Sequence, residues 1–156
     1  MYHVYKLIHI LAVVLFLGNI ITGLFWKMHA DGSKDLRIIA HTLAGIIRSD
    51  RWFTIPGVIV ITTAGILGAI QGGLPLLRTG WILWSLILFT LSGLAFAFFV
   101  APLQRVLADM TRIGANGGEF DWDRYRAKSR AWEWWGLFAT LAPLIAVGLM
   151  VLKPNL

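Results

Sequence analysis

The sequence predicts an all-α, polytopic integral membrane protein that folds as a four-helix bundle. Hydrophobic residues make up 58% of the 156 residues and charged residues only 14%, a composition too apolar for a soluble single-domain core of this size. Four apolar segments each approach the ~20 residues that a helix needs to cross the hydrocarbon of a bilayer. The chain is therefore expected to form one transmembrane domain, residues 1–156, in contact with the lipid bilayer.

The expected spans cover about residues 4–26, 53–73, 79–102 and 132–152. A short turn joins the second span to the third, whereas residues 27–51 and 103–131 form longer connections. In the first connection, apolar residues at 36, 39, 40, 43, 46 and 47 recur with helical spacing. This pattern predicts an amphipathic helix that lies in the membrane interface before the second span.

The second connection is expected to contain two helical extensions. The third helix can continue past Pro102 to about Ile113, because QRVLADMTRI keeps helical spacing, and the run ANGG then ends it. Asp121 is expected to be the N-cap of a helix that runs through DRYRAKSRAWEWWG, residues 123–136, into the fourth span.

The basic residues predict the orientation. The net charge is +6, but the cations lie at span ends and not in an aromatic-interleaved patch, so nucleic acid is not an expected partner. The two long connections hold Lys27, Lys34, Arg37, Arg48, Arg51, Arg105, Arg112, Arg124, Arg126, Lys128 and Arg130. The positive-inside rule places both connections in the cytoplasm and both termini outside, in a bacterial inner membrane.

Small residues predict how the spans pack. Such residues let helices approach closely where lipid offers no hydrophobic driving force between them. They recur every fourth residue as Ala64, Gly68 and Gly72 in the second span and as Gly93, Ala97 and Ala101 in the third. Both series are expected to be packing seams.

His9 is the only histidine within a span and is the first candidate for chemistry. Lys6 lies on the same helical face, and Arg78 and Lys153 add two further cations at the outer rim, where no carboxylate occurs. A haem b needs a neutral imidazole for its iron, apolar walls and cations or water near its propionates, so these residues form a candidate haem site. The alternative is a structural histidine near the interface, with lysines and arginines that only extend to water.

The second axial ligand is less defined. Met150 is expected at the depth of His9, and a His/Met pair is a known haem ligation, although methionine also fills gaps in cores. The chain has no cysteine, so thiolate chemistry is excluded. Small polar residues in the spans could bind a quinone headgroup or simply bond to helix backbone. No motif assigns a catalytic residue.

Three segments carry a resemblance to a known family. KLIHILAVVLFLGNIITGLFW, RSDRWFTIPGVIVITTAGILGAI and TGWILWSLILFTLSGLAFAFFVAPLQ resemble a bacterial family of predicted four-span integral membrane proteins, catalogued as a domain of unknown function. More distantly, LIHILAVV followed by an arginine-led second span is similar to the haem-binding, four-helix protoporphyrinogen oxidase family and to copper-resistance membrane proteins. In the former, the histidine associated with haem matches His9. Ser85 stands nearest to that family's functional lysine, which argues against protoporphyrinogen oxidation and is compatible with haem binding.

Two functions from different classes follow from these observations. The first is a small haem b protein that serves electron transfer or redox sensing near the outer face, with quinone as a candidate partner. The second is a cofactor-free accessory or assembly subunit that binds a larger membrane complex, or a second copy of itself, through its small-residue seams and charged connections.

Overall fold

Four long helices form the whole fold in this computed structural model, which describes residues 1–155 and contains no strand within them. The first is α1 (Tyr2–Ser33) and the last is α6 (Trp122–Leu152). The second consists of α2 (Leu36–Ser49), η1 (Asp50–Thr54) and α3 (Ile55–Gln71), and the third of α4 (Gly80–Ala95), η2 (Phe96–Val100) and α5 (Ala101–Ala115). All four are long and apolar enough to cross a membrane, which confirms the predicted fold class.

Each helix is longer than the span predicted within it. The most visible difference concerns the first connection, where residues 36–49 are helical but continue through η1 into α3 without a break. Ile39, Leu43 and Ile46 of this segment are buried inside the protein. Its location in a membrane interface stays a prediction.

Two prolines explain the π-helical segments in the middle of the second and third helices. Pro56 and Pro102 are each the second residue of the α-helix that follows η1 or η2, and each lies in its first turn. A proline inside a helix has no N–H to donate and its ring clashes with the carbonyl four residues earlier. A π turn, with its wider i to i+5 spacing, lets the helix continue past that carbonyl.

The helix ends follow from local sequence signals. α1 ends at Lys34, whose φ of 55° is left-handed, and Asp35 caps α2 by accepting a 2.8 Å hydrogen bond from the Arg37 N–H. α5 ends before Asn116 and Gly117, as the run ANGG predicts, and Asp121 caps α6 by accepting from the N–H groups of residues 123 and 124. The expected extensions of the third and fourth helices are therefore confirmed.

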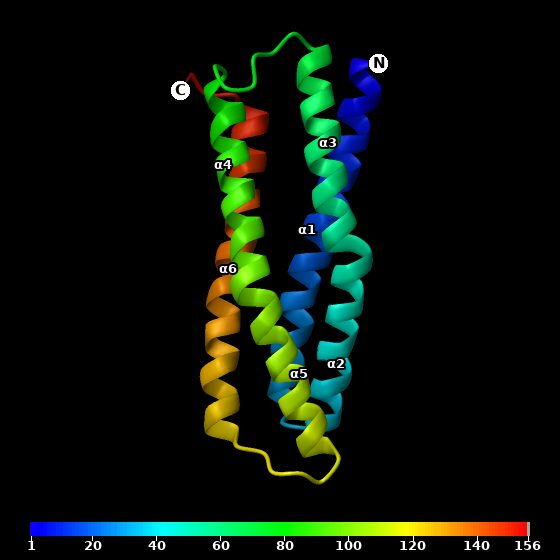
Figure 1. Cartoon of the computed structure of the whole chain (residues 1–156), viewed down its shortest axis with the longest axis vertical. Helices are drawn as coiled ribbons and strands as arrows, with labels where there is room; N and C mark the ends of the chain where they lie inside the picture. The colour runs from blue at the N-terminus through cyan, green and yellow to red at the C-terminus, as the bar shows by residue number, and fades with distance from the viewer. Residues whose placement is uncertain (156) are drawn as a thin grey trace.

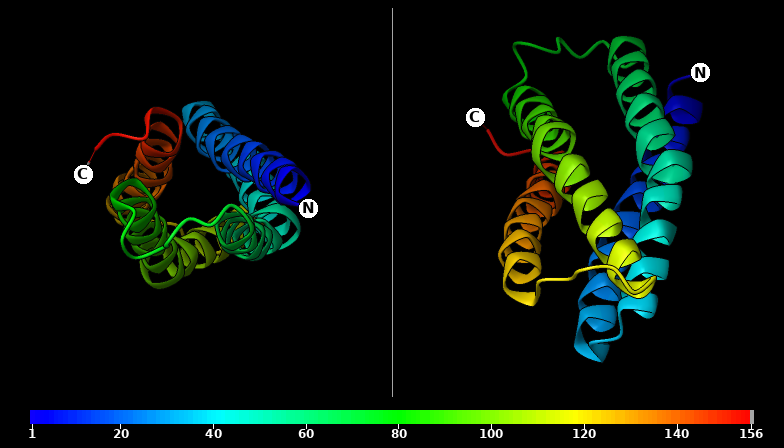
Figure 2. Two further views of the ribbon diagram at one scale, coloured as in Figure 1. Left: turned by 90° about the horizontal axis from the view of Figure 1, so that it is seen from above. Right: turned by 60° about the horizontal axis from the view of Figure 1, so that its bottom comes forward.

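The four helices associate as two pairs that meet at one end. α1 packs along α3 and α4 packs along α6, while α2 and α5 bring the pairs together (Figure 1). The same grouping is visible when the molecule is viewed from above (Figure 2). Both termini lie at one end of the bundle, which we call the termini end. The opposite end holds the α1–α2 and α5–α6 connections and most of the basic residues, and we call it the basic end.

The main hydrophobic core lies toward the basic end. It contains Ile39, Leu43, Leu107, Tyr125 and Trp132, contributed by α2, α5 and α6. A smaller cluster of Ala12, Phe16 and Ile61 joins α1 to α3 nearer the termini. The bundle is thus closed by packing at its basic end, and the helix pairs diverge toward the termini end (Figure 1).

The two predicted small-residue seams have different outcomes. On α3, a Cβ built on Gly68 lies 3.6 Å from Tyr5 and one on Gly72 lies 3.0 Å from Tyr2, so this seam packs on α1 as expected. On the third helix the expected seam is wrong, because Ala97 is exposed and a Cβ on Gly93 meets no atom within 4 Å. The packed face of α4 instead carries Ser85, Ser92 and Ala95.

Replacement of Leu107 by alanine should weaken the basic end. Leu107 is 0% exposed in the main core, and large-to-small core substitutions cost about 2–5 kcal/mol of unfolding free energy. Val106→Ala is the matched control, because Val106 is 40% exposed on the same helix. Thermal unfolding in detergent should show a clearly lower midpoint for Leu107→Ala alone; equal midpoints would contradict this core assignment.

Candidate functional site

A cavity of about 450 Å³ opens between the two helix pairs toward the termini end. Its volume lies in the usual range for sites that bind small molecules or cofactors. Most of its wall is apolar and comes from α1, α3, α4 and α6. Its polar or ligating lining residues include Lys6, His9, Thr62, Ser85, Met150 and Lys153. We call it the His9 cavity.

The His9 ring is held in one tautomer by the backbone of α3. Its Nδ1 lies 2.9 Å from the carbonyl oxygen of Ile61. A carbonyl can only accept, so Nδ1 carries the proton and the neutral ring keeps its lone pair on Nε2. Within residues 1–155, no hydrogen bond to Nε2 is present. His9, which lines the cavity, therefore has an unused ligand atom in Nε2.

Gly65 on α3 makes room for this ring. A Cβ built on Gly65 would lie 3.0 Å from both Cε1 and Nδ1 of His9, which is tighter than nearly all real Cβ contacts. The imidazole thus packs directly against the glycine backbone. Gly65 and the Ile61 carbonyl together fix where the ring lies.

The structure brings together most of the residues predicted for a haem site. Lys6, His9 and Met150 all line the same cavity, and so does Lys153, whose Nζ lies 5.5 Å from the centre of the Trp81 ring. Arg78 is the exception. It is exposed in the turn between α3 and α4 and does not line the cavity, although Leu74 and Leu76 of the same turn do.

A second cavity, of about 270 Å³, lies nearer the basic end between the two π segments. Asp50 and Thr54 of η1 line one side, and Phe96 and Val100 of η2 line the other. π turns inside α-helices occur frequently at functional sites. We call this space the Asp50 cavity.

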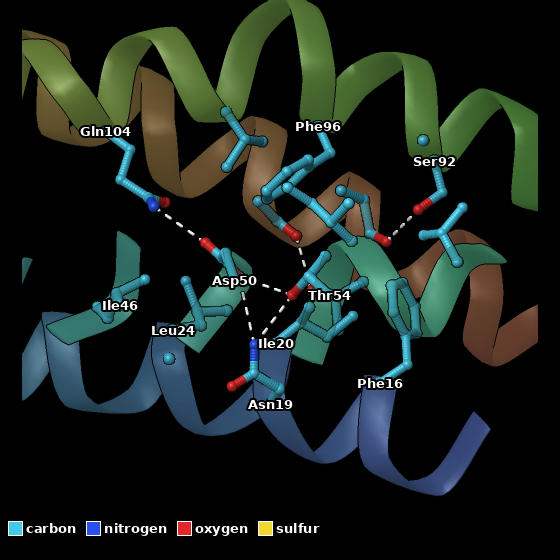
Figure 3. Close-up of a pocket in the computed structure, with 18 of the residues that line it drawn as sticks. Phe16, Asn19, Ile20, Leu24, Ile46, Asp50, Thr54, Ser92, Phe96 and Gln104 are labelled. Atoms are coloured by element: carbon cyan, nitrogen blue, oxygen red, sulfur yellow. Dashed lines mark hydrogen bonds between the residues drawn. The ribbon is translucent and has the colours of Figure 1, made fainter. Parts of the chain in front are cut away.

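The Asp50 carboxylate is 7% exposed and accepts hydrogen bonds from three neutral side chains (Figure 3). Thr54 Oγ1 donates at 2.7 Å and Asn19 Nδ2 at 3.3 Å to one oxygen, while Gln104 Nε2 donates at 2.9 Å to the other. Gln104 in turn accepts a 3.2 Å bond from Trp132 Nε1. One carboxylate therefore links α1, η1 and α5, and through Gln104 it also reaches α6.

A buried lysine joins α1 to α6 close to the basic end. Lys27 is 0% exposed, and its Nζ lies 2.7 Å from Asp31 Oδ2 and 3.0 Å from Glu133 Oε1, with a further hydrogen bond to Ser129 Oγ. Tyr125 donates to the other Asp31 oxygen at 2.6 Å. The cluster is fully paired and makes a structural clamp between the helices.

Comparison with known proteins identifies the family. Residues 3–154 match the family model described as a predicted integral membrane protein, DUF2269. The chain belongs to this family. No curated protein and no solved structure matches it, so no activity is carried over from a relative. The resemblance of this DUF2269 member to haem and copper proteins stays a prediction, and residues 1–155 contain no cluster of three or more protein metal ligands.

Sequence reasoning about this DUF2269 protein missed Asp50 and Lys27 as buried groups. Lys27 was interpreted as one of the cations of the first long connection, where most such residues face water, and Asp50 stands at the end of the same connection. The available signals were polar partners in otherwise apolar segments. Asn19 and Gln104 each sit opposite Asp50, and Asp31 follows Lys27 by four residues on the same helical face.

Loss of the Lys27 charge should destabilise this DUF2269 protein. Lys27→Met leaves the carboxylates of Asp31 and Glu133 near each other without a cation. These side chains are 22% and 34% exposed, so water partly compensates for the lost charge. We therefore expect the unfolding free energy to fall by about 1–3 kcal/mol, which is less than the usual cost of breaking a fully buried pair. Arg126→Met, at an exposed position on α6, is the control. The midpoint of unfolding in detergent measures both variants; an unchanged midpoint for Lys27→Met would show that the clamp contributes nothing.

Proposed function

We propose that the protein binds a haem b in the His9 cavity, with His9 Nε2 as an axial ligand, and serves electron transfer or redox sensing. One observation carries the proposal: Nδ1 of His9 donates to the Ile61 carbonyl and leaves Nε2 without a partner in residues 1–155. Ligating histidines commonly donate their other N–H to a carbonyl or carboxylate, which fixes the tautomer and orients the ring.

The surroundings of His9 fit the needs of a haem. The walls are mostly apolar, and Ile10, Val13, Ile61 and Leu86 are among the residues that would contact a macrocycle. The same cavity contains Lys6 and Lys153, whose ammonium groups can pair with propionates. Since a haem supplies four of its own ligands, one imidazole and one further donor complete the coordination.

Met150 is the candidate for that further donor. It lies near the end of α6 and lines the cavity together with His9. A haem bound there would supply one-electron chemistry at its iron. The protein's own contribution is to hold the neutral imidazole, exclude water with apolar walls and balance the propionate charge with two lysines.

The charge distribution supports an orientation for this site. Eleven of the 14 lysines and arginines lie at the basic end, since only Lys6, Arg78 and Lys153 lie elsewhere. By the positive-inside rule the basic end faces the cytoplasm of a bacterial cell, and the His9 cavity then lies toward the outer face of the inner membrane.

Replacement of His9 should remove the haem. We expect the detergent-purified wild-type protein, produced in cells with ample haem, to give a b-type reduced-minus-oxidised spectrum that His9→Ala lacks at matched yield. His3→Ala is the control, because His3 is exposed and lies outside the cavity lining. A wild-type protein without a Soret band would overturn the proposal and favour the accessory-subunit alternative, and so would a band that survives in His9→Ala.

A methyl group on Gly65 should loosen the haem without removing any ligand. Gly65→Ala would place its Cβ 3.0 Å from the His9 ring, so the imidazole must shift from its present position. We expect the haem-to-protein ratio to fall several-fold. Gly18→Ala tests the general effect of alanine in the bundle, because a Cβ there meets nothing within 4 Å. Equal ratios in the two variants would argue against ligation from the observed ring position.

A further inference from the structure

We propose that the Asp50 cavity binds a small lipophilic monocation, an ammonium-headed amine whose charged group pairs with the Asp50 carboxylate. This inference is independent of the haem proposal, because the two cavities have different lining residues apart from Phe16 and Phe89. The argument rests on the charge of the site, its aromatic walls and its size.

The charge of Asp50 has no counterpart in the described part of the chain. Its three hydrogen-bond donors are neutral, and no lysine, arginine or histidine of residues 1–155 forms an ion pair with it. Arg48 and Arg51, its nearest cations in the sequence, are exposed. A buried carboxylate is normally paired, because an unpaired charge away from water carries a large desolvation cost. A ligand cation would supply the missing partner.

The carboxylate also has room for one more donor. An ionised carboxylate offers about four acceptor positions, and Asn19, Thr54 and Gln104 use three of them. An ammonium group can donate to the fourth position and add charge to that hydrogen bond, which makes the bond roughly twice as strong as a neutral one.

The rest of the cavity suits the organic part of such a ligand. Phe16, Phe89, Phe96 and Trp132 line it, and aromatic faces attract cations as well as apolar groups. Asn19, Thr54 and Gln104 lie around Asp50, whereas Ser92 lies away from it (Figure 3). Ile20, Leu24 and Val58 are among the apolar lining residues. A volume of about 270 Å³ suits a single-ring amine and not a large drug-like molecule.

The test compares two ligands of nearly the same shape that differ in charge. Benzylammonium is a cation at neutral pH and benzyl alcohol is neutral, and equilibrium dialysis against the protein in detergent, with empty micelles subtracted, gives the affinity of each. We expect benzylammonium to bind at least tenfold more tightly than benzyl alcohol to the wild-type protein. Equal affinities, or no saturable binding of benzylammonium, would overturn the proposal.

Two variants locate the site. Asp50→Asn keeps the shape of the side chain but removes its charge, so benzylammonium binding should fall at least tenfold while benzyl alcohol binding changes little. Asp109→Asn is the matched control, because its carboxylate is 64% exposed on α5. Unchanged benzylammonium binding in Asp50→Asn would overturn the assignment.

A second variant keeps the test decisive if Asp50→Asn does not fold. A Cβ on Gly136 points toward Leu24, 3.9 Å away, and both residues line the cavity. Gly136→Val should therefore fill the space and weaken both ligands, and retention of full benzylammonium affinity would contradict binding in this cavity. If phosphatidylethanolamine in nanodiscs competes with benzylammonium, the natural source of the ammonium group is a lipid headgroup. If it does not compete, the source is a free amine.

Discussion

The Asp50 carboxylate is the group on which the joining of the helices depends most directly. It lies where the two helix pairs converge, and its three donors come from α1, η1 and α5. A hydrogen bond between two helices forms only when the helices are placed along the bundle axis so that donor and acceptor meet. The Asp50 side chain therefore fixes the axial positions of three helices relative to each other. The Gln104 to Trp132 bond extends the same constraint to α6. The helix pairs can diverge toward the termini end because this junction and the main core hold them at the basic end.

The prolines make that junction geometrically available. Without a wider turn, Pro56 and Pro102 would each force a clash with the carbonyl of the preceding turn. The π segments that absorb this conflict, η1 and η2, also provide Asp50, Thr54, Phe96 and Val100 to one cavity. The π segment η1, which Pro56 requires, thus lies where the Asp50 side chain enters the bundle. The coincidence of both irregularities at one cavity supports a function for that cavity beyond packing.

The sequence predicted the number and type of helices because hydropathy and length depend only on local composition. It also predicted that Lys6 would share a helical face with His9 and that Met150 would lie at the depth of His9, and all three residues line one cavity. It failed for Arg78, whose position depends on the path of a turn, and for Ala97, whose facing depends on which helix packs beside it. Lys27 and Asp50 were missed for the same reason, since each also has partners that are distant in the chain: Glu133 for Lys27, and Asn19 and Gln104 for Asp50. The spacing of residues in the sequence shows which of them share a helix face, but only tertiary packing determines which residues that face contacts.

The two cavities have opposite electrostatic character and must be kept apart for either to work. One has the His9 imidazole and two lysines at its wall, and the other has the Asp50 carboxylate. If the carboxylate approached Lys6 or Lys153, it would pair with that ammonium group, and neither charge would remain for a ligand. Phe16 and Phe89 line both cavities and pack edge to face, with ring centroids 5.6 Å apart. These two rings lie between the carboxylate and the imidazole within a single bundle, so the two proposed sites are compatible with each other.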